Sequence, residues 1–148
     1  MRIAVSSDEN YSVNEFVVTE IQARGHSVLR FGSLVSGEEM AYVDATREAA
    51  TAVACGTCDE GIFFCWTGTG ASIAANKVSG IRAALCSDAE TARGARIWNH
   101  ANVLVLSNRT LSGDIAKEIL EAWFEAPRDD PRGKEARAAL LKLDHGRG

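Results

Sequence analysis

Short apolar runs alternate with longer amphipathic segments along the chain. The apolar runs are continuous and rich in Val, Ile, Leu and Phe, which is typical of strands buried on both faces of a sheet. The pattern predicts strands at Ile3–Ser6, Ser27–Phe31, Gly61–Cys65, Ala83–Cys86 and Val103–Leu106. The amphipathic segments between these runs predict helices near Val13–Arg24, Tyr42–Cys55, Gly70–Lys77, Asp88–Trp98 and Ser112–Glu125.

Strict alternation of strands and helices predicts the α/β class, with a parallel sheet covered by helices on both faces. We expect a three-layer αβα, Rossmann-like fold with five parallel strands in the order 2-1-3-4-5. The segment Glu125–Lys134 contains both prolines, which indicates a turn or linker before a last helix near Glu135–Leu143. The tail from His145 to Gly148 is expected to be loose. The length of 148 residues predicts a single domain over residues 1–148.

Composition narrows the classes of function. Hydrophobic residues make up 46% of the chain and charged residues 24%, as in an ordinary globular protein. The formal net charge is −4 and no basic stripe is present, so nucleic acid is not an expected partner. The apolar runs are too short to cross a membrane, and the first residues carry no signal-peptide pattern. We therefore expect a cytoplasmic protein whose four cysteines are free thiols.

The ends of two predicted strands indicate where a ligand binds. In open α/β sheets, ligands bind beyond the carboxyl ends of the strands, at the point where the strand order reverses. In the order 2-1-3-4-5 this point lies between strands 1 and 3. Strand 1 runs into Ser7, Asp8 and Glu9, and strand 3 ends at Cys65. Asp8 and Cys65 are thus expected to be neighbours across a crevice.

Gly68-Thr69-Gly70 lies between strand 3 and a predicted helix. Glycines there let backbone N–H groups approach a phosphate, a carboxylate or an enediolate oxygen, and the helix N-terminus adds positive potential. The same potential favours the thiolate form of Cys65. The plainer alternatives are a structural turn and a small buried cysteine. The loop is neither a dinucleotide fingerprint nor a nucleoside-triphosphate loop, because the third glycine and the Gly-Lys-Ser/Thr are missing.

Cys55 and Cys58 have the C-x-x-C spacing of redox and zinc sites. The pair lies between a helix and strand 3, at the amino edge of the predicted sheet, and neither a second pair nor a nearby His completes a zinc site. We interpret both cysteines as structural, and Cys86 at the end of strand 4 as a small buried side chain.

The segment from Cys65 to Lys77, Cys-Trp-Thr-Gly-Thr-Gly-Ala-Ser-Ile-Ala-Ala-Asn-Lys, closely resembles the type B ribose-5-phosphate isomerase family. That family also includes the galactose-6-phosphate isomerase subunits. The resemblance covers about residues 1–143, including Asp8 and the segment around Arg109. It implies a sugar-phosphate aldose–ketose isomerase that needs no metal or cofactor. Members are dimers, often paired further, with sites shared between subunits.

The resemblance implies roles for individual residues. Cys65 matches the cysteine that moves a proton between C1 and C2, and Thr67 matches a hydroxyl that lines the sugar site. The backbone of Gly68, Thr69 and Gly70 matches the loop that stabilises the enediolate. The matched substrate-binding residues are Asp8, Ser72 and Asn99, together with Arg109 and Arg137 for the phosphate.

Three positions depart from the family pattern. Glu9 and Trp98 each stand where the family carries a His that assists phosphate binding or ring opening. Glu9 is expected to repel a phosphate, and Trp98 offers a stacking face and one N–H donor but no acid or base. Both stay candidate substrate-binding residues. A further phosphate-binding Arg falls on Gly133, with Arg132 or Lys134 as possible substitutes.

Asn99 precedes strand 5 at the amino edge of the sheet, whereas Cys65 lies at the carboxyl edge. One chain does not easily bring both to one ligand, which predicts a homodimer or a dimer of dimers in which Asn99 enters the partner's site. We predict an isomerase of a phosphorylated or acidic sugar, not necessarily ribose 5-phosphate. The alternative is a non-catalytic or regulatory homologue that binds a sugar phosphate, and a redox or metal protein ranks last.

Overall fold

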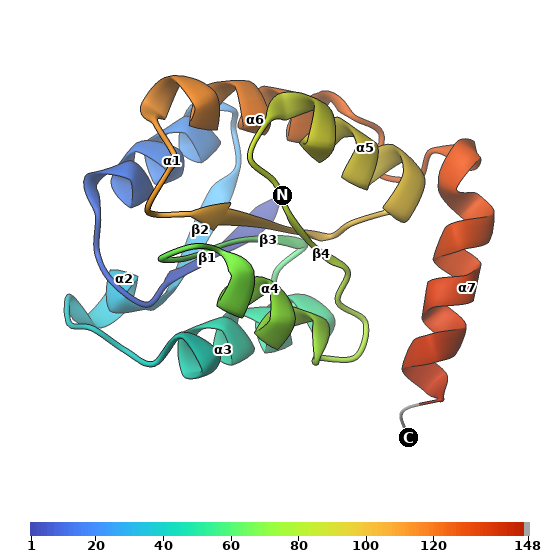
Figure 1. The fold of residues 1–148 in the computed structure, drawn as a ribbon, viewed down its shortest axis with the longest axis horizontal. Helices are drawn as coiled ribbons and strands as arrows, with labels where there is room; N and C mark the ends of the chain where they lie inside the picture. The colour runs from blue at the N-terminus through green and yellow to red at the C-terminus, as the bar shows by residue number, and fades with distance from the viewer. Residues whose placement is uncertain (147–148) are drawn as a thin grey trace.

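Five short strands form one parallel sheet (Figure 1). The computed structural model describes residues 1–146. The strands are β1 (Arg2–Ser7), β2 (Ser27–Gly32), β3 (Glu60–Cys65), β4 (Ala83–Leu85) and β5 (Val103–Ser107). Neighbouring strands are parallel, and their order is β2-β1-β3-β5-β4. The α/β class and the parallel sheet predicted from the alternation of elements are confirmed.

The predicted order 2-1-3-4-5 is wrong at its far end, because β5 lies between β3 and β4. Val103–Leu106 is completely buried, as a central strand with helices on both faces requires. β4 has only three residues, and its Leu85 is 38% exposed. A short, partly exposed strand of this kind is typical of the edge of a sheet. The side-chain amide of Asn76 pairs with the N–H and the carbonyl of Ala83 (both 2.9 Å). The order still reverses between β1 and β3, so the expected position of the crevice is unchanged.

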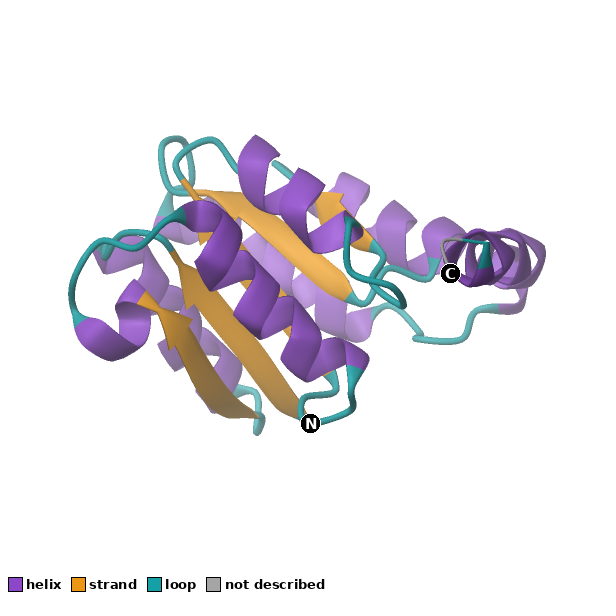
Figure 2. Cartoon of the chain, turned by 90° about the horizontal axis from the view of Figure 1, so that it is seen from below, coloured by secondary structure: helices purple, strands orange, loops and turns teal. Residues whose placement is uncertain are grey.

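Helices cover both faces of the sheet (Figures 1 and 2). They are α1 (Ser12–Ala23), α2 (Ser33–Ser36), α3 (Tyr42–Ala54), α4 (Thr69–Asn76), α5 (Ala89–Asn99), α6 (Gly113–Glu125), the 3₁₀ turn η1 (Pro131–Gly133) and α7 (Lys134–His145). α1, α5 and α6 lie on one face, and α3 and α4 on the other (Figure 1). The short α2 follows β2, and its Leu34 packs against the core of the first face. Within residues 1–146 no helix has the length and apolar character needed to cross a membrane.

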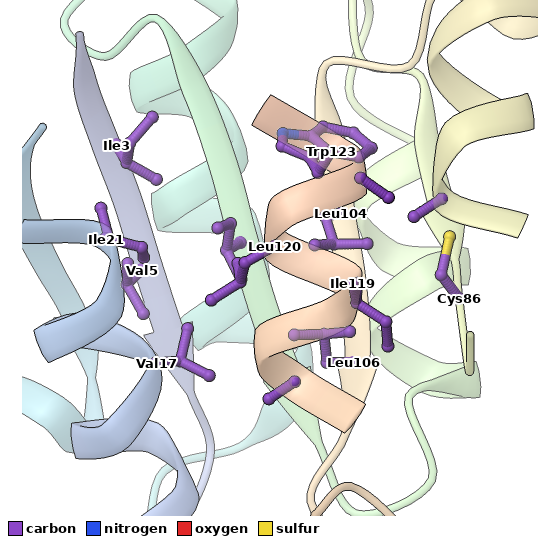
Figure 3. Packing of buried hydrophobic residues seen from close by; sticks show 14 of the residues in the cluster. Ile3, Val5, Val17, Ile21, Cys86, Leu104, Leu106, Ile119, Leu120 and Trp123 are labelled. Carbon is purple, nitrogen blue, oxygen red and sulfur yellow. The ribbon is translucent and has the colours of Figure 1, made fainter. Parts of the chain in front are cut away.

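The two faces of the sheet bury two apolar cores. In β3, Ile62 and Phe64 face α1, α5 and α6, whereas Phe63 and Cys65 face α3 and α4. The larger core is filled by side chains of α6, including the fully buried Trp123, against β1 and β5 (Figure 3). The alternation along β3 therefore places Cys65 on the α3–α4 face, at the last residue of the strand.

α7 stands beside α5, away from the sheet, and none of its residues is buried (Figures 1 and 2). The helix predicted near 135–143 extends to His145, so the assignment of His145 to a loose tail is wrong. The run of Ala, Leu, Lys, Glu and Arg favours helix throughout, and the helix ends at its C-cap Gly146. The remainder of the predicted tail, 147–148, lies outside the described residues.

Candidate functional site

The carboxyl ends of β1, β3 and β5 meet at one edge of the sheet. Ser7 pairs with Phe64, and Cys65 pairs with Ser107, so that Asp8 follows β1 beside the end of β3. This edge brings together most of the predicted site residues. We call the following set the carboxyl-edge site: Asp8, Glu9, Cys65, Thr67, Gly68, Thr69, Gly70, Ser72 and Arg109.

Cys65 points toward the beginning of α4. Its side chain is buried, and its Sγ accepts a hydrogen bond from the N–H of Ala71 at 3.4 Å. Ala71 lies in the first turn of α4, whose N-cap is Gly68. The sulfur therefore faces the N-terminal end of a helix, which carries the positive end of the helix dipole.

Two glycines let the loop after β3 fold closely. Gly68 has a φ of 83°, and a Cβ there would lie 2.5 Å from Cδ1 of Leu85. A Cβ at Gly70 would lie 2.7 Å from the ring of Tyr42. The side chains of Leu85 and Tyr42 occupy the space that a Cβ would need, so glycine at these positions lets the loop pack closely against both.

Hydroxyl groups and a guanidinium group lie on the same edge. The exposed hydroxyls of Thr67 and Thr69 are 2.8 Å apart. Thr67 also lines a hollow of about 290 Å³ together with Thr110. The exposed Arg109 is tied to the loop after β3, because its N–H donates to the Trp66 carbonyl at 2.9 Å. The edge thus carries hydroxyl groups that can form hydrogen bonds and a guanidinium group that can pair with an anion.

Asp8 has a free carboxylate oxygen. Its Oδ1 is buried and has no hydrogen-bond partner among residues 1–146. Burial raises the pKa of Asp8, and the charges of Glu9 and Glu39 act in the same direction. Buried polar atoms normally have a partner, so this oxygen is placed to accept a hydrogen bond from a ligand hydroxyl.

Tyr11 and Trp66 are residues that the sequence analysis missed. The hydroxyl of Tyr11 donates to the Glu9 carboxylate, and the Tyr11 ring centroid lies 5.7 Å from that of Trp66. The hydrogen bond to Glu9 is the main cause that raises the pKa of Tyr11 to about 12. Glu9 is thus held by an aromatic pair that joins the loops after β1 and β3. No sequence motif marks this pair, because it depends on packing between separate loops.

A buried amide relay, also missed, holds the strand ends in place. Nδ2 of Asn14 donates to Oδ1 of Asn108 at 2.8 Å, and Nδ2 of Asn108 donates to Oγ of Ser7 at 3.1 Å. The N–H of Asn108 donates to the carbonyl of Cys65 at 2.9 Å. The relay ties α1 to the ends of β1 and β3, and no local sequence pattern marks it, because Asn14 and Asn108 are 94 positions apart.

A second group of predicted residues lies at the opposite edge of the sheet. Trp98 and Asn99 end α5, shortly before β5 begins. The guanidinium of Arg132 lies 5.5 Å from the Trp98 ring centroid, and Arg137 lies on the neighbouring α7. We call Trp98, Asn99, Arg132 and Arg137 the α5–α7 cluster. Within one chain the fold separates this cluster from Cys65.

Gly133 leaves no room for the arginine that the family pattern carries. A Cβ there would lie 2.2 Å from the Ile97 carbonyl oxygen and 2.5 Å from the ring of His100. The neighbouring Arg132 is exposed, and its ion pair with Asp130 (2.8 Å) lowers the pKa of Asp130 to about 2. His100 itself is buried, with Nε2 2.9 Å from the Asp130 carbonyl oxygen. Arg132 is therefore the cation held against Trp98.

All four cysteines are free thiols. Cys55 is exposed and Cys58 is buried, and both precede β3 at its amino end. Within residues 1–146, no three His, Cys, Asp or Glu side chains are grouped to hold a metal ion. Burial raises the pKa of Cys86 to about 12, which makes it a poor nucleophile.

Comparison with known proteins identifies similar chains along nearly the whole length. Residues 3–140 match the family model described as Ribose/Galactose Isomerase. The chain is 35% identical over 147 residues to ribose-5-phosphate isomerase B of Escherichia coli K12, covering 99% of this chain and 98% of that protein. It is 37% identical over 127 residues to D-erythrulose-4-phosphate isomerase of Pectobacterium atrosepticum, covering 85% and 84%. Its structure matches ribose-5-phosphate isomerase B of Clostridium thermocellum with a TM-score of 0.91, at 36% identity and 100% coverage of both chains.

Proposed function

The chain belongs to the ribose/galactose isomerase family, and from this premise we propose that it interconverts an aldose phosphate and a ketose phosphate with Cys65 as catalytic base. The observation that carries the proposal is the contact between Cys65 Sγ and the Ala71 N–H at the start of α4. The loop from Gly68 to Gly70 leads directly into this helix. A base next to an anion-binding loop is what proton transfer through an enediolate requires.

The reaction needs one base that gives its proton back. The Cys65 thiolate takes the proton from the carbon next to the carbonyl, and the electron pair of that C–H bond forms the C=C bond of an enediolate. N–H groups of the 68–70 loop bind the new oxyanion. The thiol then returns the proton to the neighbouring carbon, while a hydroxyl proton moves between the two oxygens. The product is an isomer of the substrate, and Cys65 is a thiolate again.

Binding groups surround this step on the carboxyl-edge site. Asp8 accepts a hydrogen bond from a substrate hydroxyl through its unpartnered Oδ1. Arg109 is the exposed guanidinium on this edge and binds the phosphate. Thr67 supplies a hydroxyl beside the loop. These roles leave Cys65 free for the proton transfer.

A second copy of the chain completes the site. The α5–α7 cluster and Cys65 lie at opposite edges of the sheet, so in this proposal each cluster reaches the Cys65 of a second copy, and the two copies meet through the α3–α4 face. This face carries exposed apolar side chains: Tyr42, Val43 and Ile73 are 44%, 47% and 64% exposed. Such a patch is what a homodimer covers.

Mixed dimers should restore activity that each parent variant lacks. In a dimer of one Cys65→Ala chain and one Asn99→Ala chain, one site carries both substitutions and the other carries neither. Random pairing makes half of the dimers mixed, so about a quarter of the wild-type activity is expected after subunit exchange. Steady-state assays of the mixture and of both parents check this. Lack of recovery after exchange verified by native mass spectrometry would contradict the shared site.

We further propose that the preferred substrate is short and already open-chain. Trp98, 52% exposed beside Arg132, replaces a family His and has no acid–base function. Glu9, which replaces the other His, is a carboxylate held by Tyr11 and suits sugar hydroxyls better than a phosphate. The 37% identity to an erythrulose-4-phosphate isomerase supports a four-carbon substrate.

Deuterium exchange separates the isomerase from the alternative, a homologue that binds sugar phosphates without catalysis. The two lost family His favour that alternative. In heavy water, the wild-type protein should place deuterium on carbon in a sugar phosphate, because the Cys65 proton exchanges with solvent before it returns. Proton NMR of tetrose, pentose and hexose phosphates measures this. Binding by calorimetry with no carbon-bound deuterium in any of them would establish the non-catalytic alternative.

A further inference from the structure

A buried charged cluster lies around Glu60, outside the proposed reaction site. Glu60 begins β3 and is completely buried, at the edge of the sheet opposite Cys65. Its Oε1 lies 2.9 Å from Nη2 of Arg96 and 2.9 Å from Nε of Arg128. Its Oε2 accepts a hydrogen bond from Nε1 of Trp123 at 2.9 Å. One carboxylate thus joins three segments: α5, α6 and the loop after α6.

Arg96 holds the turn that follows α5. Its Nη1 donates to the carbonyl of Ala101 at 2.8 Å, across His100, whose φ is 49°. A residue with a Cβ rarely adopts this left-handed conformation, so the surrounding contacts must maintain it. Trp98 and Asn99 are the two residues directly before the turn. Their orientation therefore depends on Arg96, and through it on Glu60.

Arg128 holds the loop that carries the cationic part of the cluster. It is 51% exposed, and its ion pair with Glu60 fixes the loop to the buried end of β3. Two residues later, Asp130 is ion-paired with Arg132 at 2.8 Å. Arg132 in turn lies over the ring of Trp98. The end of α5 and the loop after α6, both of which contact Glu60, therefore also contact each other at the α5–α7 cluster.

We propose that Glu60 is a positioning residue, which fixes the α5–α7 cluster for binding substrate in the partner's site. The inference rests on the proposed shared site. A buried carboxylate is costly, and an apolar side chain would fill the same space without that cost. The carboxylate instead attracts two guanidinium groups to 2.9 Å by charge and accepts a hydrogen bond from an indole N–H, and an apolar side chain would hold none of the three. The chemical step occurs at Cys65 on the other edge, so Glu60 acts on binding.

Glu60→Gln should raise KM about tenfold and change kcat less than about threefold, because a displaced binding group weakens substrate and transition state together. Glu60→Asp, which keeps the charge, should recover part of the affinity. The control is Ile21→Ala, a buried substitution in α1 that destabilises the same core and removes none of the contacts of Glu60. An equal rise of KM in this control would overturn the inference.

Fluorine NMR of protein labelled with 5-fluorotryptophan tests the positioning without substrate. In Glu60→Gln, the Trp98 resonance should shift or broaden together with that of Trp123, whereas the Trp66 resonance stays unchanged. Arg128→Gln keeps the ion pair between Glu60 and Arg96, so it should shift the Trp98 resonance in the same direction as Glu60→Gln but by a smaller amount. This variant replaces Glu60→Gln in the test if Glu60→Gln does not fold. An unchanged Trp98 resonance would overturn the inference. If the wild-type protein has no isomerase activity, the proposed function is wrong. The Trp98 resonance would still show whether Glu60 positions Trp98, because that measurement needs no substrate.

Discussion

Cys65→Ala should lower the rate of isomerisation on the order of 100- to 10,000-fold, the usual contribution of a positioned acid–base group. Cys65 Sγ is the group that faces both the first turn of α4 and the 68–70 loop. Alanine removes one buried atom and leaves the packing of β3 against α3 and α4 in place. Steady-state kinetics with NMR detection of both sugars measures the loss, and circular dichroism with thermal melting confirms the fold.

Cys86→Ala is the matched control for this experiment. Cys86 is also a buried thiol that follows a strand of the same sheet, and burial raises its pKa to about 12. Its removal should leave activity within about twofold. An alkylating agent should inactivate the wild-type enzyme at Cys65, and bound substrate should slow the modification. Cys65→Ala activity within tenfold of the wild type would exclude this residue as the base.

The class of fold was predictable because burial and periodicity act locally. Each strand of a parallel sheet is covered on both faces, so its residues form one apolar run, and Val103–Leu106 is the clearest case. The lateral order of the strands is a different kind of information. It depends on which strand has neighbours on both sides. The physical signal is the contrast between Val103–Leu106 of β5, which is completely buried, and β4, which has only three residues.

The positions of Asp8 and Cys65 were predictable, because Asp8 follows β1 and Cys65 ends β3, the two strands that flank the point where the order reverses. The contacts that hold them were not predictable in the same way. The Asn14–Asn108 hydrogen bond joins residues 94 positions apart, and no local pattern marks such a pair. Glu60 precedes the apolar run that predicted β3, and a charged residue at a strand end is normally solvated. Its burial follows from Arg96 and other partners brought together by the tertiary fold.

The proposed change of substrate depends on two replaced residues, Glu9 in the carboxyl-edge site and Trp98 in the α5–α7 cluster. Ribose 5-phosphate is mostly a closed furanose, so an enzyme acting on it benefits from an acid or base that opens the ring. Trp98 has neither, and the nearby His100 is buried against the Asp130 carbonyl. Trp98 instead presents an exposed indole next to the Arg132 guanidinium, a surface that packs on the carbon face of a sugar. An open-chain substrate needs no ring opening and loses nothing at this site.

The wild-type enzyme should therefore act on erythrose 4-phosphate or erythrulose 4-phosphate with a kcat/KM at least about 100-fold above that for ribose 5-phosphate, the lower end of what an acid–base group contributes. Trp98→His should raise the activity on ribose 5-phosphate. Trp98→Phe is the matched control, because it keeps a stacking face without an acid or base and should give no such gain. Steady-state kinetics on these sugars and on ribulose 5-phosphate decides the question. Ribose 5-phosphate as the best substrate, with a kcat/KM of roughly 10⁴ M⁻¹s⁻¹ or more, would contradict this prediction. Glu9 and Trp98 would then not change the substrate preference, and ring opening would proceed without the two His of the family pattern.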